Sequence, residues 1–145
     1  MENGTIRVLL AEDVAILRKG LMMLLGAAAD VAVVGEAADG LEAVRLVGEL
    51  FPGVVLMDLS MPRLDGIGAI EEIKRLYPQV RVLALTAHLD ADMVRRTFAA
   101  GADGYLLKNV GEAELARAIR MVAGGSPYHS PEVAALLAAQ DPAAG

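Results

Sequence analysis

The sequence between Val54 and Gly66 is VVLMDLSMPRLDG. Its first four residues are apolar without interruption, which is typical of a strand buried on both faces of a parallel sheet. Asp58 ends this run, and a second acidic residue, Asp65, stands directly before Gly66. The stretch therefore predicts a buried strand that carries a carboxylate at its carboxyl end, followed by a helix with Asp65 as its N-cap.

Four similar apolar runs occur elsewhere in the chain. They are Arg7–Ala11, Val31–Gly35, Val82–Leu85 and Tyr105–Leu107. Helical patterns lie between the five runs, so strands and helices alternate along the chain. This alternation predicts an α/β fold, a doubly wound parallel sheet with helices on both faces, and right-handed crossovers leave few topologies for it.

Helical spacing and capping residues locate the helices between these strands. Apolar stripes are formed by Leu17, Leu21 and Leu24, by Ile70, Ile73 and Tyr77, and by Leu115, Ala118, Ile119 and Val122. Capping signals are Asp39 with Glu42, Asn109 with Glu112, and the single residues Asp65 and Asp90. Pro52 and Pro78 follow the second and third helices, where a helix cannot continue.

The character of the sequence changes after Ala123. Residues 124–131, GGSPYHSP, predict a loop because glycine, proline and serine are concentrated there. Ser130 then has the features of an N-cap with Pro131 at the first helical position, which predicts a short helix from Pro131 to Ala139. We expect a folded domain over residues 1–124 and a linker with a short helix over residues 125–145.

Composition narrows the function classes. The 145 residues suit one domain, and the net charge of -6 argues against a nucleic-acid-binding surface in this part of the protein. The chain has no cysteine, which excludes disulfides and thiolate metal sites and is compatible with a reducing cytoplasm. We see neither a secretory signal nor an apolar stretch long enough to span a bilayer.

Polar side chains follow four of the five predicted strands. They are Glu12 and Asp13, Asp58, Thr86, and Lys108. Ligands of doubly wound sheets bind beyond the carboxyl ends of the strands, so these residues should meet at one edge. Three carboxylates together need a cation, and hard oxygen ligands favour Mg²⁺. With a lysine and a hydroxyl beside them, they have the groups that phosphoryl transfer to a carboxylate requires.

Each of these residues alone has a simpler explanation, as a helix cap, a turn residue or a solvated surface charge. Their joint occurrence at one edge is what favours a site. The seven methionines predict core packing rather than metal binding, and His88 and His129 have no partner at ligand spacing.

Four motifs in order resemble the receiver domain of two-component response regulators. They are VLLA followed by Glu12-Asp13, MDLSMPRLDG around Asp58, LALTA with Thr86, and GADGYLLK ending at Lys108, and the resemblance covers Ile6 to Val122. It implies a flavodoxin-like, five-stranded sheet in the order 2-1-3-4-5. One departure is Asn109, where many receivers have proline.

The resemblance also implies roles for individual residues. Asp58 would be the phospho-acceptor, assisted by Lys108 and Thr86, and Tyr105 would change rotamer when Thr86 moves. Mg²⁺ would be held by Asp13, Asp58 and the backbone carbonyl of Ser60, with Glu12 acting mostly through a metal-bound water. The protein would not be an enzyme in its own right, although it takes part in its own phosphorylation and dephosphorylation. Its partner would be a histidine kinase, in the cytoplasm and without membrane contact.

LRKGLMMLL, VGEAADGLEAV and AGGSPYHSPEVAALL resemble the NarL/FixJ-type subfamily. This implies transcriptional control through a C-terminal helix-turn-helix domain outside this chain. DNA would be bound only through that domain. A homodimer formed on phosphorylation is a candidate assembly. A natural stand-alone receiver is the alternative. Two other classes fit less well. A haloacid-dehalogenase-type phosphohydrolase needs an acid where Ser60 stands, and an FMN carrier needs a phosphate-binding loop where Glu12 and Asp13 stand.

Overall fold

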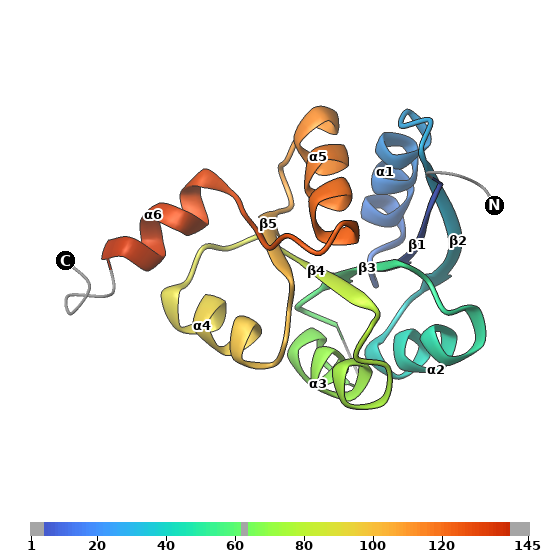
Figure 1. Cartoon of the computed structure of the whole chain (residues 1–145), viewed down its shortest axis with the longest axis horizontal. Helices are drawn as coiled ribbons and strands as arrows, with labels where there is room; N and C mark the ends of the chain where they lie inside the picture. Colours follow the sequence, from blue (N-terminus) through green and yellow to red (C-terminus); the bar gives the residue numbers. More distant parts are fainter. Residues whose placement is uncertain (1–4, 62–63, 140–145) are drawn as a thin grey trace.

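The computed structural model describes residues 5–61 and 64–139. Twelve elements alternate along this part of the chain (Figure 1). They are β1 (Ile6–Ala11), α1 (Ala15–Gly26), β2 (Val31–Ala37), α2 (Gly40–Leu50), β3 (Val54–Asp58), α3 (Gly66–Leu76), β4 (Arg81–Thr86), α4 (Ala91–Ala99), β5 (Gly104–Leu107), α5 (Glu112–Ala123), β6 (Tyr128–His129) and α6 (Pro131–Ala139).

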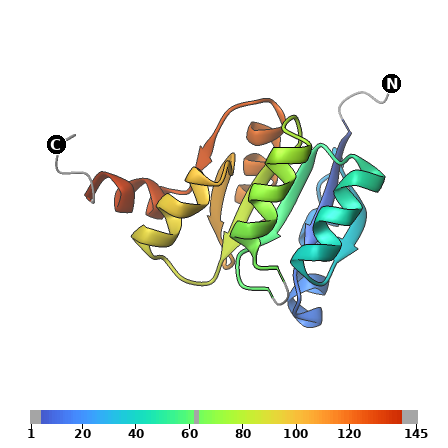
Figure 2. The same ribbon diagram turned by 90° about the horizontal axis from the view of Figure 1, so that it is seen from below.

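The strands form one parallel sheet in the order β2-β1-β3-β4-β5-β6. Helices α1 and α5 cover one face, and α2, α3 and α4 cover the other (Figures 1 and 2). The predicted fold class and the order 2-1-3-4-5 are therefore confirmed, with a short sixth strand added at the β5 edge. Among the described residues, no helix is long and apolar enough to cross a membrane.

The sheet separates two apolar layers because successive side chains of a strand point to opposite faces. In β3, Val54 and Leu56 pack toward α1 and α5, whereas Val55 and Met57 pack toward the other helices. All five residues of β3 are buried, as the unbroken apolar run predicted. Asp58 continues this buried strand, so its carboxylate is held at the end of the most enclosed element of the sheet.

Most of the predicted helix starts are confirmed. The side chains of Asp39, Asp65 and Asp90 each accept a hydrogen bond from a backbone N–H in the first turn of the following helix. The expected capping box of Asn109 with Glu112 is wrong, because the N-cap of α5 is Gly111 and has no side-chain cap bond. Val110 donates its backbone N–H to the Leu107 carbonyl instead and lies buried, so the chain makes a turn before α5 begins.

The apolar stripe of α1 is shifted from the predicted one. Leu21 and Leu25 are buried, whereas Leu17 is 44% exposed. The α5 stripe is confirmed, since Leu115, Ala118, Ile119 and Val122 are all buried. A stripe is easier to predict where one face of a helix is apolar than in α1, where apolar residues occur around the whole helix.

The segment after α5 differs from the predicted loop in one respect. Tyr128 and His129 form β6, which pairs with Gly104 and Tyr105 of β5. The physical reason is that the outer edge of β5 would otherwise have unpaired backbone groups. The helix predicted from Pro131 to Ala139 is confirmed, and the Ser130 hydroxyl accepts from the Val133 N–H at 3.4 Å, as expected of an N-cap.

Candidate functional site

Three strand ends bring Glu12, Asp58 and Lys108 together. Glu12 follows β1, Asp58 ends β3, and Lys108 follows β5, so all three stand at the carboxyl edge of the sheet. The Lys108 Nζ lies 2.9 Å from Glu12 Oε1 and 3.0 Å from Asp58 Oδ1. Glu12 and Asp58 are buried, which is unusual for carboxylates without a specific purpose.

Asp13 completes a cluster of carboxylates. One carboxylate oxygen from each of Glu12, Asp13 and Asp58 lies within 4.8 Å of the others, and Asp13 is only partly buried. The cluster therefore has a buried floor and one side that is open to solvent.

The two oxygens of Asp58 have different surroundings. Oδ1 receives Lys108 Nζ at 3.0 Å and the Ser60 backbone N–H at 3.1 Å. Oδ2 is buried and has no hydrogen-bond partner among the residues that the structure describes. An unpartnered buried carboxylate oxygen is costly, so a ligand bound to Oδ2 would compensate for a partner that the described residues do not supply.

The electrostatics of the cluster favour an added cation. Burial raises the pKa of Asp58 to about 6, with a smaller upward contribution from Glu12, against the opposing effects of Lys108 and the Ser60 N–H. Burial disfavours the charged form of Lys108, but its bonds to Glu12 and Asp58 outweigh this and raise its pKa. Three carboxylates against one lysine leave an excess of negative charge when all are ionised.

The donor set fits a hard divalent ion, because one carboxylate oxygen from each of Glu12, Asp13 and Asp58 lies within 4.8 Å of the others. Carboxylate oxygens are the ligands that Mg²⁺ prefers, and the ion uses one or two of them while keeping several waters. Glu12, Asp13 and Asp58 are the residues that would hold such an ion. The open side at Asp13 leaves room for such waters.

The loop after Asp58 is held tightly against the strand end. Gly66 begins α3, and a Cβ added to it would lie 2.4 Å from the Asp58 carbonyl oxygen and 2.5 Å from Leu59 Cα. The Gly66 N–H donates to the Leu59 carbonyl at 3.2 Å. Only glycine fits here, so Asp65-Gly66 serves the site by allowing α3 to start directly beside the buried carboxylate.

Thr86 lies on β4, the strand next to β3, and Tyr105 lies on β5, one strand further from Asp58. Asp58 pairs in register with Leu85, so Thr86 stands one residue beyond it on β4. Thr86 is buried, and its Oγ1 accepts a hydrogen bond from the His88 N–H at 3.3 Å. Tyr105 is fully buried, which raises its pKa, and the nearby Thr86 hydroxyl opposes that rise.

Arg18 is a residue of this region that the sequence analysis missed. Its Nη1 donates to the Glu12 backbone carbonyl at 2.6 Å, and its Nε lies 3.1 Å from Glu36 Oε1. It therefore ties the β1–α1 loop to the end of β2. A signal was present in the sequence, because a cation in the first turn of a helix opposes the helix dipole and needs a specific partner.

Comparison with known proteins identifies the family. The family model for the response regulator receiver domain matches residues 8–120. The chain belongs to this family. It is a receiver domain of a two-component response regulator and not a classical enzyme. The phosphohydrolase and FMN-carrier alternatives receive no support from this match.

Individual relatives place the receiver among LiaR- and NarL-type regulators. It is 46% identical to the transcriptional regulatory protein LiaR of Bacillus subtilis (strain 168), over 89% of this chain and 61% of LiaR. A two-component response regulator of the LuxR family from Aurantimonas sp. SI85-9A1 has a TM-score of 0.90, with 38% identity over 94% of this chain and 97% of that one. The signal receiver domain of NarL from Mycobacterium tuberculosis has a TM-score of 0.79, with 34% identity over 83% and 98%.

These similarities confirm the predicted NarL-type resemblance. The receiver spans about three fifths of the length of its curated relatives, 61% of LiaR for example. The match therefore assigns a family to this domain, and the activity of a full-length protein is treated under the proposed function.

Proposed function

We propose that Asp58 accepts a phosphoryl group from a phosphohistidine of a partner histidine kinase. The observation that carries this proposal is the buried Asp58 Oδ2, unpartnered among the described residues, within a carboxylate cluster bridged by Lys108. In the reaction, Oδ2 attacks phosphorus, a P–O bond forms, the P–N bond breaks, and the imidazole leaves with the electron pair of that bond.

The surrounding residues act on charge and orientation. Lys108 holds Oδ1 of Asp58 and can turn to a phosphoryl oxygen once the acyl phosphate has formed. The Thr86 hydroxyl donates to another phosphoryl oxygen. The Ser60 N–H holds Oδ1, so that Oδ2 keeps one direction. When bound at Asp13, Asp58 and the Ser60 carbonyl, Mg²⁺ would neutralise the charge that gathers on the phosphoryl oxygens.

The switch follows from the added charge. Phosphorylation adds about -1.5 to -2 charges at a buried position. Thr86 and Lys108 bind those oxygens in only one arrangement of α4 and β5, and this difference in contacts shifts the population. Two or three charge-assisted hydrogen bonds of about 1.5–3 kcal/mol each supply roughly 3–9 kcal/mol, a range that includes the ~5.5 kcal/mol that a nearly complete shift needs. Tyr105 would change rotamer with Thr86.

For the whole protein, we infer transcriptional control through a C-terminal DNA-binding domain. The support is the name of LiaR as a transcriptional regulatory protein and the fact that this chain spans 61% of it. In this reading residues 1–124 are the switch and residues 125–145 begin the linker, of which 140–145 lie outside the described residues. We expect it to act in the cytoplasm. A stand-alone receiver that acts through protein contacts is the second candidate.

Intact-mass spectrometry tests the acceptor. With Mg²⁺ and acetyl phosphate, the chain should gain the mass of one phosphoryl group, and Asp58→Asn should gain none. Asp103→Asn is the matched control, since it removes a carboxylate at the opposite end of the sheet. The same gain in Asp58→Asn would overturn the assignment, and runs with candidate histidine kinases would identify the partner.

A further inference from the structure

The end of β2 touches the acceptor site through its backbone, whereas the ends of β1, β3 and β5 supply the side chains of that site. Strand β2 lies next to β1 in the sheet. The Glu12 N–H donates to the carbonyl of Ala37, the last residue of β2, at 3.0 Å. The turn from β2 into α2 is therefore fixed relative to the loop that carries the acidic pair Glu12 and Asp13.

Hydrogen bonds around the first turn of α2 hold this turn in one conformation. The Glu42 N–H donates to Asp39 Oδ1 at 2.8 Å, and the Ala38 N–H donates to Glu42 Oε1 at 2.8 Å. The two side chains thus bond to each other's backbone segment, as in a capping box. Gly40, the first residue of α2, is held between these bonds and is buried.

Gly40 meets the loop that follows the acceptor strand. A Cβ added to Gly40 would overlap the carbonyl oxygen of Leu64 and would lie 2.7 Å from its carbonyl carbon. Both are backbone atoms, so the loop would have to shift. Figure 2 shows α2 and α3 side by side on one face of the sheet. Because Gly40 has no side chain, the N-terminus of α2 lies directly against the backbone that leads into α3.

The same loop orients the acceptor carboxylate. Two residues beyond Leu64, the Gly66 N–H donates to the Leu59 carbonyl at 3.2 Å. The next residue, Ser60, donates its backbone N–H to Asp58 Oδ1 at 3.1 Å. A displacement of Leu64 would therefore be passed through the bond of Gly66 to the backbone that orients Asp58.

Helix propensity does not explain a glycine at this position. Alanine is the better helix former, so Gly40 weakens the start of α2 relative to alanine. The close contact with Leu64 supplies a reason for glycine that lies outside the helix, in the position of the loop after Asp58.

We propose that Gly40 is a positioning residue for phosphoryl acceptance by Asp58. Its lack of a side chain lets α2 hold the loop where the Ser60 N–H fixes Oδ1 and so gives the attacking Oδ2 one direction. This inference rests on the proposed function. It adds to that function a residue of the β2–α2 turn that itself binds neither the phosphoryl group nor a metal ion.

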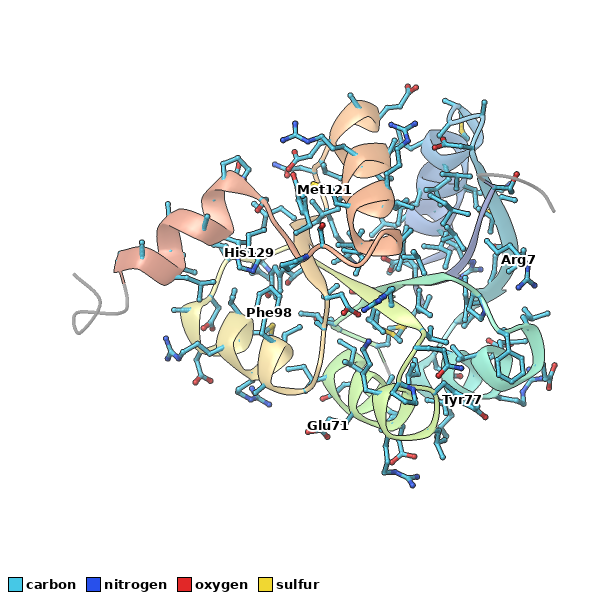
Figure 3. The ribbon with its side chains drawn as sticks, viewed as in Figure 1. Arg7, Glu71, Tyr77, Phe98, Met121 and His129 are labelled. Atoms are coloured by element: carbon cyan, nitrogen blue, oxygen red, sulfur yellow. The ribbon has the colours of Figure 1, made fainter. Side chains whose placement is uncertain are left out.

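Gly40→Ala tests this role, with Gly48→Ala as the matched control in the same helix. A Cβ at Gly48 would lie 2.5 Å from the hydroxyl oxygen of Tyr77, which is the far end of a side chain that can move. Figure 3 shows Tyr77 beside α2. The control therefore adds the same methyl group to α2 without meeting the loop after Asp58.

Two measurements on the full chain separate positioning from stability. With Mg²⁺ and acetyl phosphate, Gly40→Ala should gain phosphoryl mass at least about tenfold more slowly, because a displacement of ~1 Å can cost about 100-fold in rate. Without either, exchange of the Ser60 amide, followed by NMR, should rise by about fivefold, the change that corresponds to one typical hydrogen bond. In Gly48→Ala both quantities should stay within about twofold of the wild type.

A wild-type rate or unchanged Ser60 exchange in Gly40→Ala would overturn the inference, and so would equal effects in the two variants. If circular dichroism shows that Gly40→Ala does not fold, Leu64→Ala loosens the same contact from the loop side. It should slow the mass gain by about threefold or more, and wild-type behaviour would overturn the inference. No mass gain by the wild type would overturn the proposed function, whereas the Ser60 exchange would still decide whether Gly40 positions the loop.

Discussion

Two clusters of carboxylates and cations lie at opposite ends of the same sheet. At the amino end, Asp103 Oδ2 binds Lys74 Nζ at 2.8 Å and accepts the Val82 N–H at 2.8 Å. Lys74 also donates to the Val80 carbonyl. At the carboxyl end, Lys108 bridges Glu12 and Asp58, but Asp58 Oδ2 has no partner among the described residues.

The two clusters differ in how far their charges and polar atoms are paired. Asp103 forms a closed cluster with Lys74 and, at 3.7 Å, with Arg81, so its negative charge is compensated and the cluster stabilises the fold. The cluster around Asp58 has an excess of negative charge and a buried oxygen that no described residue bonds, so it costs stability until a ligand completes it. Residue types alone do not distinguish the two clusters, whereas the hydrogen bonds do.

The aspartates give the sharpest test of this comparison. Asp58→Asn should abolish phosphoryl acceptance and raise the free energy of unfolding by about 1 kcal/mol, because it removes a buried charge whose pKa is raised to about 6. Asp103→Asn should accept the phosphoryl group normally and lose about 1–3 kcal/mol of stability. Intact mass measures phosphoryl acceptance, and urea denaturation measures the free energy of unfolding. Equal stability changes in both variants would contradict the difference between the two clusters.

The lysines give the next largest effect. Lys108→Ala should still bind Mg²⁺, because the carboxylates remain, but the change that acetyl phosphate produces in the hydrogen exchange of α4 and β5 should be largely lost. Lys74→Ala should keep that response and lose about 2 kcal/mol of stability. Calorimetric Mg²⁺ titration and hydrogen exchange check the pair, and a full response in Lys108→Ala would refute its role.

A substitution of Arg18 tests whether Mg²⁺ binding by the Asp58 cluster depends on residues that orient its ligands without binding the ion. Arg18→Met removes the donor to the Glu12 carbonyl, and we expect about tenfold weaker Mg²⁺ binding, as for other groups that orient metal ligands. Arg45→Met on the exposed face of α2 is the control, since Arg45 pairs only with Glu42 and Glu49 in the described structure. Equal affinities in the two variants would restrict Arg18 to a structural role.

Loss of the hydrogen bond from Tyr128 to Glu114 should give the smallest change in stability. Both groups of this pair are already hydrogen-bonded to each other, unlike Asp58 Oδ2, which has no partner among the described residues. Burial and the Glu114 carboxylate raise the pKa of Tyr128 from 10.0 to about 12. A raised pKa in the folded state means that this contribution is fully present below pH 10 and is lost as the pH rises through 12. Tyr128→Phe should lose about 1 kcal/mol at neutral pH and show a flatter stability profile in this alkaline range. Denaturation series from neutral to alkaline pH would detect either result.

Local pattern was sufficient for most of the fold. Val54–Met57 predicted a buried strand because an apolar run of that length has to be enclosed, and Ser130-Pro131 predicted a helix start from capping chemistry alone. The predicted capping box of Asn109 with Glu112 was wrong because that motif considers only four residues and not their packing against the rest of the chain. Val110, the neighbour of Asn109, is drawn into the apolar layer between β5 and α5, and the helix therefore starts after Gly111.

The sequence by itself determined the alternation of strands and helices and the polar residues at or directly after the carboxyl ends of β1, β3, β4 and β5. Those features depend on burial and spacing within one segment. Only the tertiary structure decided that Lys108 reaches two carboxylates at once, that Asp58 Oδ2 has no partner among the described residues, and that β6 pairs with the edge of β5 beside Tyr105. Such features are set by distances of about 3 Å between atoms on separate strands, and these distances depend on how the crossovers pack rather than on any local pattern.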